Sequence, residues 1–102
     1  MVKVVLERKL TTTVCTIYYP NIPDEPTLKI TLAALSAFND IITKQATLNG
    51  LPIIDLRLVC NENDDYANEI EPSDKGGKKI ANTIYEVLEN HYFSSKRTTI
   101  YY

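Results

Sequence analysis

The chain has few of the residues that mark several large classes of protein. Only two of its 102 residues are cysteines, Cys15 and Cys60, too few for a disulfide scaffold and without metal-site spacing. No apolar run approaches the ~20 residues that span a bilayer, and charged side chains interrupt the first ten positions, unlike a signal peptide. A net charge of −2 gives no support for a nucleic-acid partner. We therefore expect a cytoplasmic protein that binds neither membrane nor nucleic acid.

The residues that are present have the composition of an ordinary globular domain. Hydrophobic residues make up 44% of the chain and charged residues 24%, which argues against wholesale disorder. At 102 residues the chain is one domain at most, at the low edge of the ~100–150 residues typical of a domain. We therefore expect a single domain over residues 1–102.

The spacing of apolar residues predicts helices that alternate with strands. Residues 12–19 are rich in β-branched and aromatic side chains and predict a strand, and apolar residues recur at helical spacing over residues 27–48. A second strand is expected over residues 52–60, and Ser73 is expected to cap a last helix. Residues 2–10 are interpreted as a short helix, although their valines also suit a strand. The order helix-strand-helix-strand-helix predicts parallel strands joined by a right-handed crossover.

The sheet edges and the last ten residues complete this expected α/β architecture. Two or three strands cannot form a doubly wound sheet, so unpaired strand edges are expected. Residues 93–102 have weak patterning and could fray or add an edge strand. The buried face of the last helix is expected to consist of Ile80, Ala81, Ile84, Val87 and Leu88.

Three polar side chains fall inside segments that are expected to be buried. Asn39 interrupts the apolar stripe of the long helix, so its amide is expected to hold a neighbouring loop or strand end, with a catalytic role as the alternative. Asp55 and Arg57 are expected to satisfy each other or a neighbouring segment. Both cysteines are expected to behave as small buried hydrophobes.

Two pairs of residues mark the ends of the helices. Asn49 and Gly50 are expected to close the long helix, since glycine takes the left-handed conformation easily. Gly76 and Gly77 lie in the first turns of the last helix, where each costs roughly 1 kcal/mol relative to alanine. A close approach of the helix backbone to the sheet would offset that cost.

The loop after the second strand is the first place to look for chemistry. In open α/β sheets, sites form beyond the carboxyl ends of the strands. This loop is acidic, and clustered carboxylates can bind a hard cation through oxygen. Its spacing lacks the Asp-x-Asp-x-Asp-Gly pattern of a calcium loop, so a solvated acidic loop is favoured and no metal or cofactor is expected. The carboxylates in question belong to Glu62, Asp64, Asp65, Glu69 and Glu71.

Several segments, in order and spacing, resemble a known family of hydrolases. The segments are Val14–Tyr18, Phe38–Asn39, Gly50–Arg57, Asp65–Asn68 and Ile70–Ala81. Together they look like the C-terminal half of an SGNH/GDSL-type hydrolase domain, over nearly the whole chain. The resemblance implies a partial flavodoxin-like, three-layer α/β/α fold and an ester- or acyl-hydrolase ancestry.

The chain departs from the family's pattern at the residues that perform catalysis. The family's Gly-Asp-Ser block and the blocks that supply the oxyanion-hole Gly and Asn are absent. The last family block, Asp-x-x-His-Pro, corresponds to residues 68–72, so Asn68 stands at the acid position and Glu71 at the base position. Glu71, Asn68 and Asp65 are the catalytic candidates in this part of the chain. The single histidine, His91, lies at the end of the last helix, remote from Glu71.

Three hypotheses follow for the function. The first is a fragment of an SGNH-type hydrolase without independent esterase activity. The second is a split hydrolase, in which a complementary N-terminal half supplies the missing catalytic blocks. The third is a non-catalytic module that forms a homodimer. In the last two, the partner would bind through the exposed sheet edge.

Overall fold

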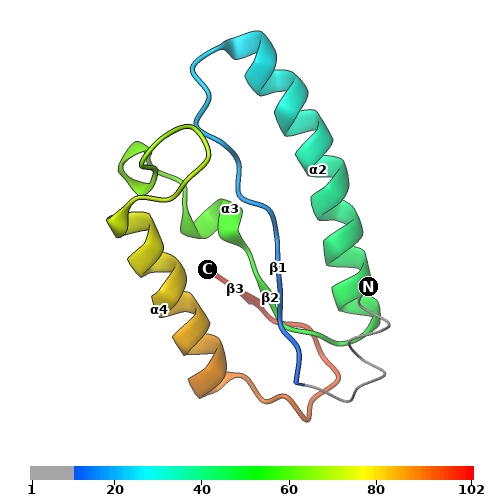
Figure 1. The fold of residues 1–102 in the computed structure, drawn as a ribbon. Coiled ribbons are helices and arrows are strands. Elements are labelled where there is room, and N and C mark those ends of the chain that lie inside the picture. The colour runs from blue at the N-terminus through cyan, green and yellow to red at the C-terminus, as the bar shows by residue number, and fades with distance from the viewer. Residues whose placement is uncertain (1–10) are drawn as a thin grey trace.

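A small parallel sheet lies between two long helices in the computed structural model, which describes residues 11–102 (Figure 1). The sheet has the strand order β1-β2-β3, and both pairings are parallel. The predicted α/β class with parallel strands is thus confirmed, and the helix expected over residues 2–10 lies outside the described residues. The elements are β1 (Val14–Cys15), α2 (Glu25–Leu48), β2 (Ile53–Ile54), α3 (Leu56–Val59), η1 (Asn63–Asp65), α4 (Asp74–Asn90) and β3 (Ile100–Tyr101).

The central strand β2 joins the two halves of the core. Ile53 packs with Ala46 of α2, whereas Ile54 packs with Val87 of α4. Successive side chains of a strand point to opposite faces, so these contacts place the two helices on opposite faces of the sheet. Figure 1 shows the same arrangement, with α2 and α4 on either side of the strands. All four residues are nearly inaccessible to solvent.

The second strand is much shorter than the sequence suggested. The expected strand over residues 52–60 ends at Ile54, and residues 56–59 form the one-turn helix α3. Asp55 causes the change, because its carboxylate accepts a hydrogen bond from the backbone N–H of Arg57 and caps α3. The alternating pattern of residues 55–58 therefore does not reflect a strand, and that prediction was wrong.

The other two strands are also short. Only Val14 and Cys15 of the expected strand over residues 12–19 pair as β1. The alternative that residues 93–102 contain an edge strand is confirmed, since β3 pairs with β2 along Ile53 and Ile54. Cys15 is exposed and Cys60 is buried, so the expectation of two buried cysteines was wrong for Cys15.

The helix ends form where local side chains satisfy free backbone groups. The carboxylate of Asp24 accepts from the backbone N–H of Thr27 and begins α2, and Gly50 follows its end with a φ of 64°. Ser73 caps α4 through a 3.1 Å hydrogen bond from the backbone N–H of Gly76. None of the helices in the described part of the chain is long and apolar enough to cross a membrane.

The two glycines of α4 differ, and only one fits the expected close approach. A Cβ atom on Gly76 would lie 2.1 Å from the carbonyl oxygen of Asp65, whereas one on Gly77 would meet nothing within 4 Å. The close approach is to the loop before α4 and not to the sheet. The expected close approach to the sheet was therefore wrong for both glycines. Gly76 does approach another backbone segment, but that segment is the loop at Asp65, and Gly77 approaches nothing.

Asn39 connects α2 to the chain after β1, as the sequence predicted. Its Oδ1 accepts from the backbone N–H of Ile17 at 2.7 Å, and its Nδ2 donates to the carbonyl oxygen of Ile17 at 2.9 Å. The side chain is almost completely buried. The amide thus pairs with Ile17 in the way that a residue of a neighbouring strand would.

We expect Asn39→Ala to lower the free energy of unfolding by about 2 kcal/mol, because both backbone groups of Ile17 lose their partner. Urea denaturation followed by circular dichroism measures the change. Asn82→Ala, at an exposed position of α4, is the control and should change stability little. Equal stability of the two variants would contradict the role assigned to Asn39.

Candidate functional site

The acidic loop of residues 61–73 lies beyond the carboxyl end of β1. The hydroxyl of Tyr18 donates to the carbonyl oxygen of Ile70. The backbone N–H of Asn21 donates to the carbonyl oxygen of Glu69 at 2.8 Å. In Figure 1 the loop lies beside the chain that leaves β1, at the end of the sheet where α4 begins. The loop is therefore at the end of the sheet where α/β proteins place their sites.

Asp65 has a structural position inside this loop. Its side chain is 0% exposed and pairs with the Lys79 ammonium, with 2.8 Å between Nζ and Oδ1. Its Oδ2 accepts from the backbone N–H groups of Asn61 and Glu62, both at 3.0 Å. Burial acts to raise the pKa of Asp65, but Lys79 and the two N–H donors outweigh it and lower the pKa. Asp65 is thus an ionised carboxylate that holds the loop to α4.

Asn68 and Glu71 shape the outer part of the loop. The Oδ1 of Asn68 accepts from the backbone N–H groups of Ile70 at 3.0 Å and Glu71 at 2.8 Å, which forms a local turn. The Glu71 side chain is exposed, and its carbonyl oxygen accepts from the backbone N–H of Ala67. Within residues 11–102 the Asn68 amide does not orient the Glu71 carboxylate, so the two do not form an acid–base pair.

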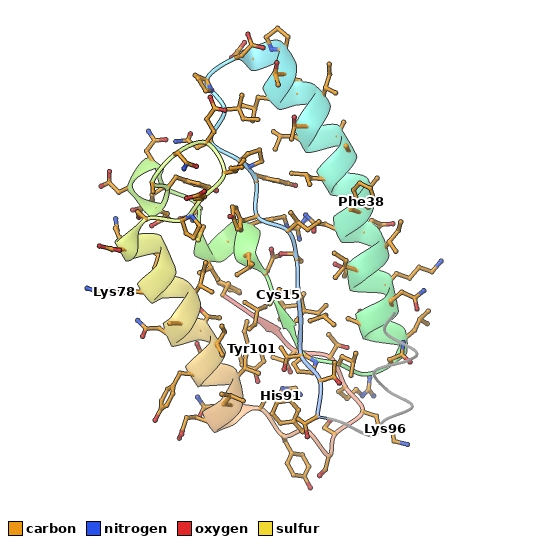
Figure 2. The ribbon with its side chains drawn as sticks, viewed as in Figure 1. Cys15, Phe38, Lys78, His91, Lys96 and Tyr101 are labelled. Atoms are coloured by element: carbon orange, nitrogen blue, oxygen red, sulfur yellow. The ribbon has the colours of Figure 1, made fainter. Side chains whose placement is uncertain are left out.

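In the part of the chain that the structure describes, the remaining polar groups supply neither a nucleophile that Glu71 could activate nor an acid that would orient Glu71. The hydroxyl of Ser73 is engaged as a helix cap and also donates to the carbonyl oxygen of Asp64. Nδ1 of His91 lies 2.9 Å from the hydroxyl of Tyr101. Figure 2 shows His91 near the end of α4 away from the acidic loop. Among the described residues, no three His, Cys, Asp or Glu side chains are grouped to hold a metal ion.

No protein-family model, curated protein or solved structure matches this chain. The likeness to SGNH/GDSL hydrolases therefore rests on the sequence segments alone. The structure adds one feature to them, which is the position of residues 68–72 at the carboxyl end of a parallel strand.

The outer edge of β1 is the second part of the candidate site. The N–H groups of Val14 and Thr16 bond to the chain of β2, so those of Thr13 and Cys15 point away from the sheet. The next outward residue is Ile17, whose backbone groups are already bonded to Asn39. Within the described residues no strand pairs with this edge, and the part that can accept one ends at Cys15.

An apolar groove of about 310 Å³ runs between this edge and α4. Its floor is Ile54 and Val87, and Leu88, which is 67% exposed, lies at its rim. Only part of the predicted buried face of α4 is covered, since Ala81, Ile84 and Leu88 are exposed. The helical spacing of these residues predicted an apolar face. It could not show that residues 11–102 leave part of that face uncovered. The groove is lined by Thr11, Thr13, Cys15, Ile54, Ile84, Val87 and Leu88.

Two lowered carboxyl pKa values predict how stability depends on pH. The pKa of Asp55 is lowered, chiefly because the Arg57 guanidinium donates hydrogen bonds to its carboxylate, and the pKa of Asp65 is also lowered. Both carboxyls bind protons less readily in the folded chain than in the unfolded chain, where their pKa is about 3.9. Their stabilisation is therefore present above about pH 4 and is lost as the pH falls through the folded values. Urea titrations from about pH 6 down to about pH 2 should show this decline, and a constant free energy of unfolding would contradict it.

Proposed function

We propose that this chain is the C-terminal half of an SGNH-type hydrolase domain and has no esterase activity by itself. The carrying observation is that residues 68–72, which correspond to the family's last catalytic block, lie beyond the carboxyl end of β1, and that no strand of residues 11–102 pairs with the outer edge of β1. In a complete sheet, a strand on that edge would end beside the same loop. The catalytic serine would come from such a strand and its loop.

The exposed surface supports an incomplete domain. Large apolar side chains are exposed on α2, among them Phe38 at 57% and Ile41 at 57%. Since α2 and α4 lie on opposite faces of the sheet, apolar side chains are exposed on the helices of both faces.

The purified chain should hydrolyse short p-nitrophenyl esters no faster than buffer, because no nucleophile–base pair lies among the described residues. Initial rates by absorbance measure this. Glu71→Gln is the matched control and should give the same background rate. A rate well above buffer that copurifies with the chain and falls in Glu71→Gln would contradict the proposal.

The second candidate is a split hydrolase in which another polypeptide supplies the serine, glycine and asparagine. The groove beside β1 favours it, because the groove joins an unpaired strand edge to exposed apolar side chains of α4. A cytoplasmic location is part of both proposals, and the two free cysteines are compatible with it. A second copy of the chain could also occupy the edge, which would give the homodimeric module.

A pair of exposed residues on α4 separates these alternatives. Leu88 lines the groove and Tyr85 does not, although both are exposed on the same helix. If the groove binds a second copy, light scattering should show a dimer that Leu88→Lys dissociates and Tyr85→Lys does not. If it binds a complementary half, that chain should copurify with wild type and Tyr85→Lys but not with Leu88→Lys. A monomer with no copurifying chain would remove both alternatives and leave the inactive fragment.

A further inference from the structure

A polar pocket at the carboxyl ends of β1 and β2 is separate from the apolar groove. Its volume is about 240 Å³, and it lies between the chain that leaves β1 and the segment from α3 to η1. Such pockets at the strand ends are where α/β sheets bind small molecules. The pocket is lined by Tyr19, Pro20, Asn21, Arg57, Cys60, Asn61, Glu62, Asn63 and Tyr66.

Arg57 is held rigidly at this pocket. Its Nε donates to Oδ1 of Asp55 at 2.9 Å and its Nη2 to Oδ2 at 2.7 Å, so one edge of the guanidinium is fixed. The Asp55 carboxylate is buried and also accepts from the hydroxyl of Thr16 at 3.0 Å. The guanidinium has five N–H groups, and three of them remain beyond the two that Asp55 accepts. The Arg57 side chain is 31% exposed, so solvent and solutes can reach it.

Several other polar side chains line the pocket. The hydroxyl of Tyr19 lies 3.3 Å from that of Ser36, and Ser36 and the Arg57 guanidinium both lower the Tyr19 pKa. Within the described chain, the side-chain amides of Asn61 and Asn63 make no hydrogen bond. Glu62, the one carboxylate of the lining, is paired with Lys75 at 2.8 Å. The pocket thus offers several donors and a carboxylate that is already neutralised.

We propose that this pocket binds a small carboxylate through Arg57 and the hydroxyl of Tyr19. The free edge of a guanidinium is planar, and its parallel N–H groups match the two oxygens of a carboxylate. Pro20 and Tyr66 provide apolar walls for a short hydrocarbon tail. The inference uses residues of this chain alone and does not depend on the hydrolase ancestry.

Butyrate and its uncharged analogue butyramide test the proposal by nuclear magnetic resonance of the full ¹⁵N-labelled chain. Butyrate at millimolar concentration should shift the Nε–H signal of Arg57 and the side-chain amide signals of Asn61 and Asn63. Butyramide should have to be at least about tenfold more concentrated to give the same shift, because it lacks the negative charge of butyrate. Equal shifts with both compounds, or none with butyrate, would overturn the proposal.

Two variants identify the groups that bind. Tyr19→Phe should weaken butyrate binding by about tenfold, since it removes one hydrogen bond to a charged group, whereas Tyr92→Phe at an exposed remote site should not. Arg57→Lys retains the charge for Asp55 but loses the planar fork, so it should weaken butyrate binding more than butyramide binding. If Arg57→Lys fails to fold, Tyr19→Phe decides alone. Unchanged affinity in Tyr19→Phe would exclude the proposed contact.

Discussion

Asp65→Asn should destabilise the chain by about 3 kcal/mol or more, a large share of the stability of a small domain. The substitution keeps the size of the side chain but removes the charge that pairs with Lys79 at 2.8 Å. It also turns an amide N–H₂ toward one of its former donors, either Lys79 or the N–H groups of Asn61 and Glu62. Burial makes each lost partner costly, because the side chain is 0% exposed and water cannot replace it.

Asp64→Asn is the matched control for this experiment. Asp64 is the adjacent residue, carries the same charge and has an 84% exposed side chain whose nearest ammonium, that of Lys75, is 4.0 Å away. Its loss should change the free energy of unfolding by less than about 0.5 kcal/mol. Chemical denaturation of both variants at neutral pH gives the comparison. Two equal and small effects would show that Asp65 does not hold the loop to α4.

Gly76→Ala should cost about 3 kcal/mol or prevent folding, since its Cβ atom would lie 2.1 Å from the carbonyl oxygen of Asp65. That oxygen belongs to the backbone and already accepts from the N–H of Ser73 at 2.8 Å. Relief of the contact would therefore move the start of α4 away from the loop. The same movement would weaken the Ser73 cap and the pairing of Asp65 with Lys79.

Gly77→Ala, one residue further along α4, should have the opposite effect. A Cβ atom there meets nothing within 4 Å, and alanine favours the helix by up to ~1 kcal/mol over glycine. Thermal unfolding followed by circular dichroism should thus show a lower midpoint for Gly76→Ala and an equal or higher midpoint for Gly77→Ala. Destabilisation of similar size in both variants would contradict the close approach at Gly76.

The sequence predicted those features of the fold that depend on local patterns. The 3.6-residue period placed α2 and α4, and the capping residue Ser73 fixed the start of α4. The pairing of Asp55 with Arg57 and the buried hydrogen bonds of Asn39 followed from the cost of leaving buried polar groups unsatisfied. In each case the prediction required only that a buried polar group find a partner, and for Asn39 it did not say which residue that would be.

The features that the sequence did not predict depend on contacts between distant segments. The segment from Ile53 to Val59 suits a strand, but the Asp55 carboxylate caps α3 and is also bonded to the hydroxyl of Thr16, 39 positions earlier in the chain. Asp65 looked like one of several acids in a solvated loop, and its partner Lys79 lies fourteen positions further along the chain. The Arg57 pocket likewise joins residues near 20 with residues near 60. No periodicity in the sequence reports such pairs.

The strand order has a consequence for the way the chain reaches this structure. Val14 pairs with Ile53, and Ile53 with Ile100, so the two strand pairings close loops of about forty and about fifty residues before they gain any contact. The helices, in contrast, need only neighbours a few positions away. We therefore expect α2 and α4 to form early and the sheet to form late, with the loops between them setting the rate. Until the sheet forms, Ile53 and Ile54 are exposed along with the apolar faces of both helices, and chains in that state can associate with one another.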